Sequence, residues 1–190
     1  MTLSTRTAVA ADRATVLALI DGARGEGLSP EERAERGFVQ GRFDGDKLAS
    51  MEATTGVYVA EEDGRIAGAA LTAPASPALD EGPPRQTWEA ALRAGLAPDR
   101  FYLYGPVVVD PAFRGRGVVR SLLRAVDANL RDRFDHGVLF VERSNHKSLA
   151  VHRHLGMREA AEFTVADRTY TVFSFASGTF CDQPAATPAG

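Results

Sequence analysis

The chain has 190 residues, a formal net charge of −3 and a hydrophobic share of 44%, which suits a single globular domain. The weak net charge and the lack of a long apolar run argue against a nucleic-acid or membrane partner. A single cysteine excludes an intrachain disulfide, and residues 2–11 lack a signal-peptide pattern, so we expect a cytoplasmic protein. The four histidines have no metal-ligand spacing, so we expect no metal site.

The first third of the sequence mixes short strands with amphipathic helices. Asp12 can cap a helix, and Ser29-Pro30-Glu31-Glu32 is a capping box with proline at the first helical position. Asp63-Gly64 supplies the tight turn of a hairpin. These signals and the apolar spacing predict strands over 5–10, 57–61 and 66–71, and helices over 13–23, 30–37 and 46–53.

The middle of the chain carries a long excursion before its most apolar strand. Residues 73–84 are rich in Pro, Ala, Ser and Asp and predict a loop, and a helix is expected over 87–94. This long connection either lines a binding cleft or is a surface loop without a binding role. The strand expected over 101–109 is apolar on both faces, which favours a central position in a sheet. Gly105-Pro106 predicts a bulge within it, because proline cannot donate to a strand ladder.

The last third repeats the strand–helix pattern and ends in a hairpin. Helices are expected over 118–133 and 145–154, and strands over 137–141, 162–165 and 169–175. The whole pattern predicts an α/β or α+β domain, with a mixed sheet of about seven strands and helices on both faces. We expect a single domain over 1–177 and a mobile tail over 178–190.

The glycine-rich loop after the central strand is the strongest functional signal. Its sequence is Arg114-Gly115-Arg116-Gly117-Val118-Val119, and such a loop at the start of a helix directs backbone N–H groups and the positive end of the helix dipole toward an anion. A nucleoside-triphosphate loop is excluded, because no Lys and Ser/Thr follow the last glycine. A dinucleotide-binding loop needs a third small residue, where this chain has Arg120.

Two blocks of the sequence together resemble one enzyme family. The first block is this loop with Val109-Asp110-Pro111 upstream of it. The second block runs from Asn145 to Met157 and is similar to the pattern Asn-x-x-Ala/Ser-x-x-x-Tyr-x-x-x-Gly-Phe, with Ser148 at the small position and Gly156 at the glycine. Both blocks resemble the GNAT N-acetyltransferase superfamily, and the order of the expected elements is similar to the GNAT acyl-CoA N-acyltransferase fold.

The resemblance implies a site for acetyl-CoA along the central strand and the loop that follows it. In the family, the main chain after a splay of this strand holds pantetheine, the glycine-rich loop binds the pyrophosphate through backbone N–H groups, and the asparagine of the second block contacts the coenzyme. The coenzyme-binding residues implied here are Val107, Val108, Val109, Arg114, Gly115, Arg116, Gly117, Val118, Val119, Asn145 and Ser148.

The resemblance leaves the proton-transfer residues open. Where the family has a tyrosine that protonates the departing thiolate, this chain has His152, whose unperturbed pKa of about 6.5 suits the same task. His152 is either this acid or a residue that only packs against the pantetheine arm. As the base that deprotonates the acceptor amine we expect Glu142. The alternatives for the base are Glu61, Glu62, Asp110 and a water chain.

The implied activity is transfer of the acetyl group of acetyl-CoA to a primary amine by direct attack, because no cysteine lies near the expected site to form a thioester with the enzyme. The acceptor is expected to be a small molecule or a peptide, and the protein a monomer or a homodimer. Two alternatives stay open. One is an acyltransferase that uses a longer acyl group, and the other is a non-catalytic acyl-CoA-binding module that lacks the family tyrosine.

Overall fold

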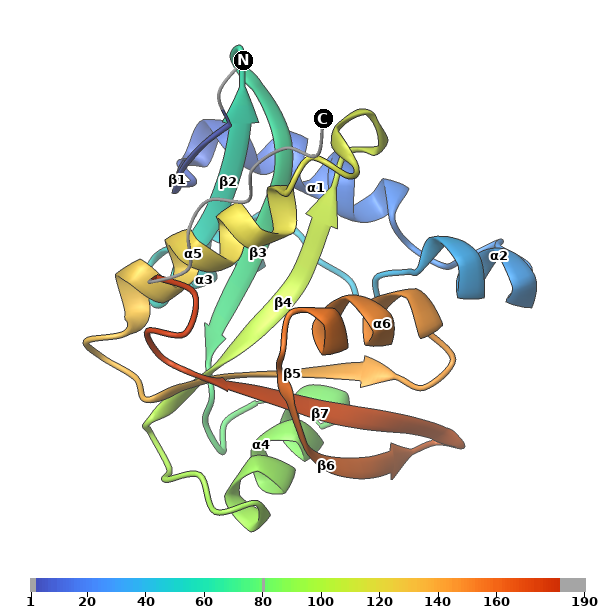
Figure 1. Ribbon diagram of the computed structural model, residues 1–190, viewed down its shortest axis with the longest axis vertical. Coiled ribbons are helices and arrows are strands. Elements are labelled where there is room, and N and C mark those ends of the chain that lie inside the picture. The colour runs from blue at the N-terminus through green and yellow to red at the C-terminus, as the bar shows by residue number, and fades with distance from the viewer. Residues whose placement is uncertain (1–2, 80, 182–190) are drawn as a thin grey trace.

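A mixed seven-stranded sheet forms the centre of the protein, with its strands in the order β1-β2-β3-β4-β5-β7-β6 (Figure 1). The computed structural model describes residues 3–79 and 81–181. The strands are β1 (Ser4–Thr7), β2 (Val57–Glu62), β3 (Arg65–Pro74), β4 (Phe101–Val109), β5 (His136–Glu142), β6 (Arg158–Val165) and β7 (Arg168–Ala176). The helices are α1 (Arg13–Gly22), α2 (Pro30–Arg36), α3 (Gly45–Glu52), α4 (Pro83–Arg93), α5 (Val118–Leu130) and α6 (His146–His154). The predicted mixed fold is confirmed.

The central strands β4 and β5 pair over a short length and then separate. They run parallel, and their register covers only Phe101 to Leu103 of β4 against His136 to Val138 of β5. Beyond this point the two strands diverge, so the sheet opens into a V (Figure 1). No other strand of the described chain pairs with this edge of β4, so its backbone groups beyond Leu103 face an open wedge. We call the closed end of this wedge, where Tyr104 follows the last paired residue, the apex.

The bulge predicted at Gly105-Pro106 is present in β4. Val107 pairs with Ala70 of β3, while Tyr104 pairs with Thr72, so two residues of β4 stand opposite one residue of β3. The extra residue shifts the alternation of side chains along the strand. Tyr104 and Val107 therefore lie on the same face of the sheet, in one hydrophobic cluster, although they are three positions apart.

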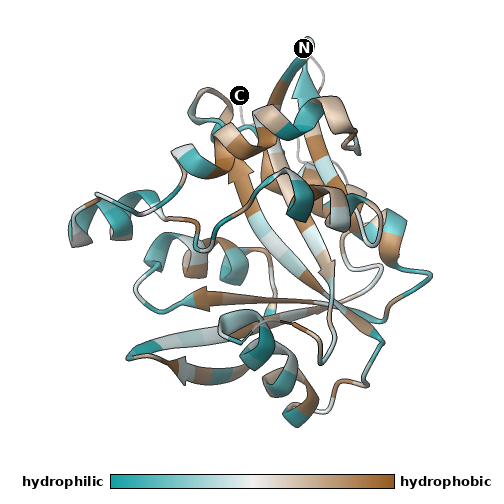
Figure 2. Ribbon diagram, turned by 180° about the vertical axis from the view of Figure 1, so that it is seen from behind, coloured by the Kyte–Doolittle hydropathy of each residue, from teal (hydrophilic) through white to brown (hydrophobic). Residues whose placement is uncertain are grey.

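Helices cover both faces of the sheet (Figures 1 and 2). On one face α5 packs four fully buried side chains into the main cluster: Leu122, Leu123, Val126 and Leu130. On the other face α1 and α3 cover β2, β3 and the end of β4, and α4 covers the other half of the sheet. Within the described residues no helix is long and apolar enough to span a membrane.

Most elements begin and end within a few residues of the prediction, and the larger shifts have physical reasons. Helix α4 begins at Pro83 instead of 87, because proline is tolerated in the first turn of a helix. Strand β6 begins at Arg158 instead of 162, because pairing with β7 extends it. Strand β1 ends at Thr7, and a short turn over Ala10–Asp12 replaces its expected end, where the Asp12 carboxylate accepts a hydrogen bond from the Val9 N–H at 2.8 Å.

The segment after β7 differs from the expected mobile tail as far as the structure describes it. The ring of Phe180 is 1% exposed and meets the ring of Phe175 edge to face, 5.1 Å between centroids. The buried Asp127 carboxylate accepts hydrogen bonds from the N–H groups of Gly178 and Phe180, both at 2.8 Å. The start of the expected tail is therefore part of the folded body. Residues 182–190 of that tail lie outside the described residues.

Candidate active site

The loop between β4 and α5, residues 110–117, leaves the start of α5 open. It begins with a tight turn in which the Asp110 carboxylate accepts a hydrogen bond from the Ala112 N–H at 2.8 Å. Gly115 and Gly117 both have φ of +76°, in the left-handed region that glycine adopts without strain. Gly117 is also the residue that precedes the first turn of α5, and as a glycine it brings no capping side chain. The N–H groups of Val118 and Val119 therefore have no partner within the helix and none from a capping side chain, at the positive end of the helix dipole.

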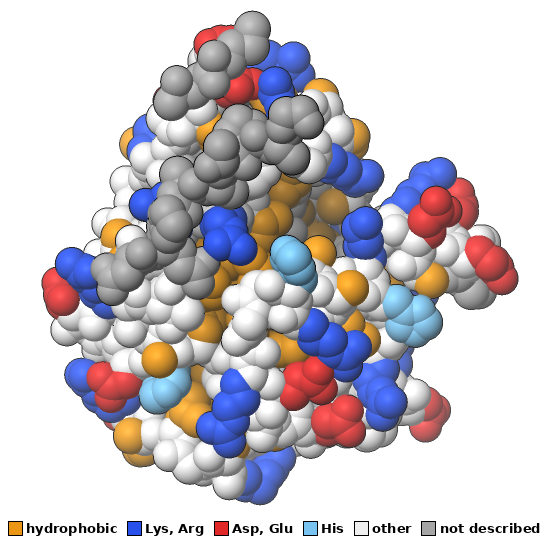
Figure 3. Space-filling model, viewed as in Figure 1, with side chains coloured by type: hydrophobic (Ala, Val, Ile, Leu, Met, Phe, Trp, Pro, Cys, Tyr) orange, Lys and Arg blue, Asp and Glu red, His pale blue; other side chains and the backbone are white. Residues whose placement is uncertain are grey.

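These N–H groups face a pocket between α5 and α6, the two helices that flank the wedge. The pocket is lined by Val109, Phe113, Arg114, Gly115, Gly117, Val118, Val119 and Lys147. Figure 3 shows this face of the molecule, with hydrophobic side chains in the recess and cationic side chains at its border. Arg114 and Lys147 come from opposite walls, one from the loop and one from α6. An apolar recess with an open helix N-terminus and two cations at its walls suits a phosphate group attached to an uncharged chain.

The second arginine of the loop is engaged within the protein. The Arg116 guanidinium donates to the Glu62 carboxylate at 2.6 Å and lies over the ring of Phe113. Glu62 is the last residue of β2, and its side chain is 11% exposed. This contact holds the side chain of Arg116 toward the β2–β3 hairpin. Arg116 is not among the residues that line the pocket.

Close packing of α5 on the sheet fixes the position of the loop. A Cβ built on Gly68 of β3 would lie 2.6 Å from the Val108 carbonyl oxygen and 2.8 Å from Cγ1 of Val118. Only a residue without a side chain lets the start of α5 approach β3 and β4 this closely. The spacing between the sheet and the open helix end thus depends on Gly68.

Asn145 is used by the protein fold. Its side-chain Oδ1 accepts a hydrogen bond from the Ser148 N–H at 3.2 Å, which caps α6. Its Nδ2 donates to the Phe38 carbonyl at 2.8 Å, which ties the α2–α3 connection to the start of α6. The side chain is buried. The structure thus places Asn145 at the β5–α6 corner, as a cap and an anchor.

His152 lies on the buried face of α6 with one ring nitrogen fixed. Its Nδ1 is 2.7 Å from the Ser148 carbonyl oxygen, and its ring faces Phe173 at 5.7 Å between centroids. A carbonyl oxygen can only accept, so Nδ1 carries a proton, and in the neutral ring Nε2 carries a lone pair. Burial lowers the pKa of His152 below its usual value, against the opposing effect of the Ser148 carbonyl. Near neutral pH the ring is therefore neutral, with its lone pair on Nε2.

Glu142 lies at the end of β5, and its carboxylate is surrounded by partners. Oε2 accepts a hydrogen bond from Gln40 and lies 3.6 Å from the Arg168 guanidinium, and Oε1 accepts from the Ser144 hydroxyl. Gln40 belongs to the α2–α3 connection and Arg168 starts β7. Glu142 thus joins two segments that border the open end of the wedge. Arg143, its neighbour in sequence, pairs with Glu162 instead.

The other carboxylates considered as bases lie elsewhere. Glu61 pairs with Arg6 at 3.0 Å on the β1–β2 side of the sheet, and Glu62 pairs with Arg116 beside the loop. Asp110 is held in the turn at the start of the loop. All three lie at the loop end of the wedge or outside it, while the apex is at Tyr104, further back along β4.

Two residues of the site were not found from the sequence. Lys147 lines the pocket from α6, and Tyr104 lies at the apex with a buried hydroxyl that has no hydrogen-bond partner in the described part of the chain. Lys147 stands two positions after Asn145, and this nearness to a matched motif is the one sequence signal that points to it. For Tyr104 the signal is its place just before the predicted bulge. Among residues 3–79 and 81–181, no group of three or more His, Cys, Asp or Glu is placed to hold a metal ion.

Comparisons with known proteins identify the family and the fold of the chain. Residues 24–157 match the family model described as Acetyltransferase (GNAT) family. The solved structure of yncA, a putative acetyltransferase from Salmonella typhimurium with its cofactor acetyl-CoA, is similar over 100% of both chains, with a TM-score of 0.64 and 22% identity.

Two further solved structures have the same fold at low identity. The ribosomal-protein-S18-alanine N-acetyltransferase of Escherichia coli covers 93% of this chain and 94% of its own, with a TM-score of 0.60 and 15% identity. A putative phosphinothricin N-acetyltransferase covers 92% of this chain and 98% of its own, with a TM-score of 0.59 and 20% identity. A comparison with curated protein sequences found no significant match.

Proposed function

Because the chain belongs to the acetyltransferase (GNAT) family, we propose that it transfers an acetyl group from acetyl-CoA to a primary amine by direct attack. The observation that carries this proposal is the open start of α5. There two left-handed glycines direct backbone N–H groups into a pocket whose walls carry Arg114 and Lys147. A diphosphate fits this combination of helix dipole, backbone donors and two cations.

The proposed path of the coenzyme follows β4 from the loop toward the apex. Gly115 to Val119 bind the diphosphate through their N–H groups, and Arg114 and Lys147 add positive charge from both walls. Val107, Val108 and Val109 offer the unpaired edge of β4 to the amide groups of the pantetheine arm, because β5 has left this edge beyond Leu103. Ser148 and Asn145 hold the facing end of α6 in place.

We assign to the bulge in β4 the hydrogen-bond donor that stabilises the reacting thioester. The acceptor nitrogen forms a bond to the thioester carbonyl carbon, negative charge develops on the carbonyl oxygen, and the carbon–sulfur bond then breaks. A backbone N–H at the bulge, from Gly105 or Val107, is the proposed donor to that oxygen. Such a donor in a site shielded from water lowers the barrier by about 3–4 kcal/mol.

His152 handles protons in this proposal in a way that differs from the family tyrosine. Its neutral ring has the proton on Nδ1, held by the Ser148 carbonyl, so Nε2 accepts a proton before it can donate one. We therefore assign His152 to the uptake of the proton that the attacking amine releases, directly or through water, and to its return to the thiolate. Glu142 is assigned a positioning role, since its oxygens already bind Gln40, Ser144 and Arg168.

One observation favours a second candidate, a non-catalytic acyl-CoA-binding module. In its resting form His152 has no proton on Nε2 for the thiolate, and the family tyrosine is absent. The acceptor class stays as broad as the similar structures suggest. One of them is a ribosomal-protein-S18-alanine N-acetyltransferase, and another is a putative phosphinothricin N-acetyltransferase. The proposed acceptor is therefore a small molecule or a peptide with a primary amine.

The experiment that tests the proposed function measures thiol release from acetyl-CoA with a panel of small amines and peptides, together with the mass of the product. We expect thiol release that matches the acetylated acceptor. Lys147→Ala should raise the KM for acetyl-CoA, while the control Arg93→Ala, an exposed arginine on α4 outside the pocket, should not. Binding of coenzyme A without turnover across the panel would favour the module, and no binding at all would refute both.

A further inference from the structure

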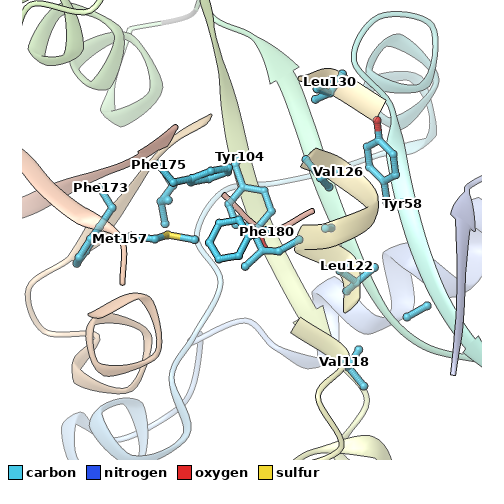
Figure 4. Packing of buried hydrophobic residues seen from close by; sticks show 14 of the residues in the cluster. Tyr58, Tyr104, Val118, Leu122, Val126, Leu130, Met157, Phe173, Phe175 and Phe180 are labelled. Atoms are coloured by element: carbon cyan, nitrogen blue, oxygen red, sulfur yellow. The ribbon is translucent and has the colours of Figure 1, made fainter. Parts of the chain in front are cut away.

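The aromatic ring of Phe180 occupies the space between the two helices that flank the wedge. In Figure 4 it lies between Met157 and Leu122, next to Tyr104 and Phe175. It is 1% exposed and belongs to the same hydrophobic cluster as these four residues. A residue from the end of the described chain thus fills the region at the apex.

The segment that carries Phe180 is held by the buried carboxyl group of Asp127. Asp127 of α5 is 0% exposed, and each of its two carboxylate oxygens accepts one backbone N–H, from Gly178 and from Phe180. Hydrogen bonds to an ionised acceptor are stronger than neutral ones, and a buried carboxylate that loses them is left without compensation. Two hydrogen bonds to Asp127 therefore hold the segment of Phe180 against the apex.

The direction of the coenzyme in the proposed function brings the acyl group toward Phe180. With the diphosphate at the start of α5 and the pantetheine arm along Val109 and Val107, the arm runs back along β4 toward Tyr104. The six residues from Tyr104 to Val109 are separated by five rises of about 3.3 Å each, which span about 17 Å. Because the bulge puts Tyr104 on the same face as Val107 and Val109, the arm meets the cluster around Tyr104 and Phe180 at its end.

We propose that Phe180 sets the acyl-chain length of this protein, with acetyl as the preferred group, and this inference rests on the proposed function. Each added methylene extends the acyl chain further toward the apex, where Tyr104, Phe175, Met157 and Phe180 are packed together. A dense core accepts extra methylenes only by forcing side chains out of place. A shorter side chain at position 180 leaves the room that a longer acyl chain needs.

The test compares acetyl-, butyryl- and hexanoyl-CoA on the full chain, with Phe180→Leu and Phe180→Ala as variants. The matched control is Phe163→Leu, which shortens a buried phenylalanine of the cluster under α4, on the other face of the sheet. Dissociation constants and kcat/KM are measured for each acyl-CoA, and thermal unfolding is recorded for every variant. The leucine variant decides the outcome if the alanine variant does not fold.

We expect the wild type and Phe163→Leu to prefer acetyl- over hexanoyl-CoA by about tenfold or more, and Phe180→Leu to reduce this preference by about tenfold. The inference is overturned if the wild type binds acetyl-CoA and Phe180→Leu keeps the same chain-length profile. It is also overturned if the wild type accepts hexanoyl-CoA as well as acetyl-CoA. A wild type that binds none of the three refutes the proposed function itself, which is a distinct result.

Discussion

Replacement of Gly68 by alanine is expected to damage both the fold and the coenzyme site, because one methyl group has no room there. The new Cβ would lie 2.6 Å from the Val108 carbonyl oxygen and 2.8 Å from Cγ1 of Val118. The Val108 oxygen moves only with the backbone, so β3 and β4 must separate locally, and the side chain of Val118 at the start of α5 must shift as well. Overpacking of this kind costs about 1–3 kcal/mol of unfolding free energy. For a chain of this size that corresponds to a fall in Tm of about 2–12 °C.

The functional consequence follows from what Val118 does. It is the first residue of α5 and lines the pocket, so a displaced Val118 also displaces the N–H groups beside it. We expect coenzyme A to bind roughly tenfold more weakly, since small misplacements of binding groups carry large costs. Thermal unfolding and isothermal titration calorimetry with coenzyme A measure the two effects separately.

A glycine with open space around it provides the control. Gly22 lies at the end of α1, and a Cβ built on it meets no atom within 4 Å. Gly22→Ala should keep coenzyme affinity and leave the free energy of unfolding unchanged or raised by up to about 1 kcal/mol. Wild-type Tm and wild-type affinity in Gly68→Ala would refute the reasoning. Lost stability with full affinity would show that Val118 does not position the loop.

Three further changes test other parts of the account. Glu142→Gln keeps the shape of the side chain and most of its hydrogen bonds, so kcat should stay within about tenfold of wild type while the KM for the acceptor rises; a loss of a hundredfold or more in kcat would identify Glu142 as the base. Asp127→Asn places an amide donor opposite a backbone N–H, which leaves two donors facing each other. It should lower the free energy of unfolding, measured by urea titration, by about 1.5–3 kcal/mol. An unchanged free energy of unfolding would contradict the role of the buried carboxylate. Because the pKa of His152 is lowered in the folded protein, the unfolded chain binds a proton at this residue first as the pH falls below about 6.5. The free energy of unfolding should therefore decrease below that pH. His152→Phe should make this decrease smaller. A pH dependence of unfolding identical to wild type in His152→Phe would contradict that shift.

Much of the fold was predictable because its signals are local. The capping box at Ser29, the turn at Asp63-Gly64 and the apolar spacing of α5 each act within a few residues, and the structure has these elements where the sequence places them. The bulge at Gly105-Pro106 was also predictable, since proline removes a donor from the strand. The strand order and the short pairing of β4 with β5 depend on contacts between distant segments, which local signals do not encode.

Some features of the candidate site were likewise predictable from the sequence, and others were not. The loop from Arg114 to Val119 carries its conformation in its glycines, so its role as an anion site is visible in the sequence. The tautomer of His152 and the partners of Glu142 depend on groups that only folding brings together, as the contact between Gln40 and Glu142 illustrates. Phe180 was assigned to a tail because glycine and proline surround it, and the buried Asp127 that holds it lies 53 positions earlier.

The central claim, that the N–H groups from Gly115 to Val119 bind the diphosphate of coenzyme A, is tested most directly by an NMR titration of the backbone amides. Coenzyme A and 3′-dephospho-coenzyme A should both shift the resonances of these five residues, whereas pantetheine, which has no diphosphate, should leave them in place while affecting Val107 and Val109. Saturation with coenzyme A that leaves the amides of Gly115 and Gly117 unmoved would contradict the claim.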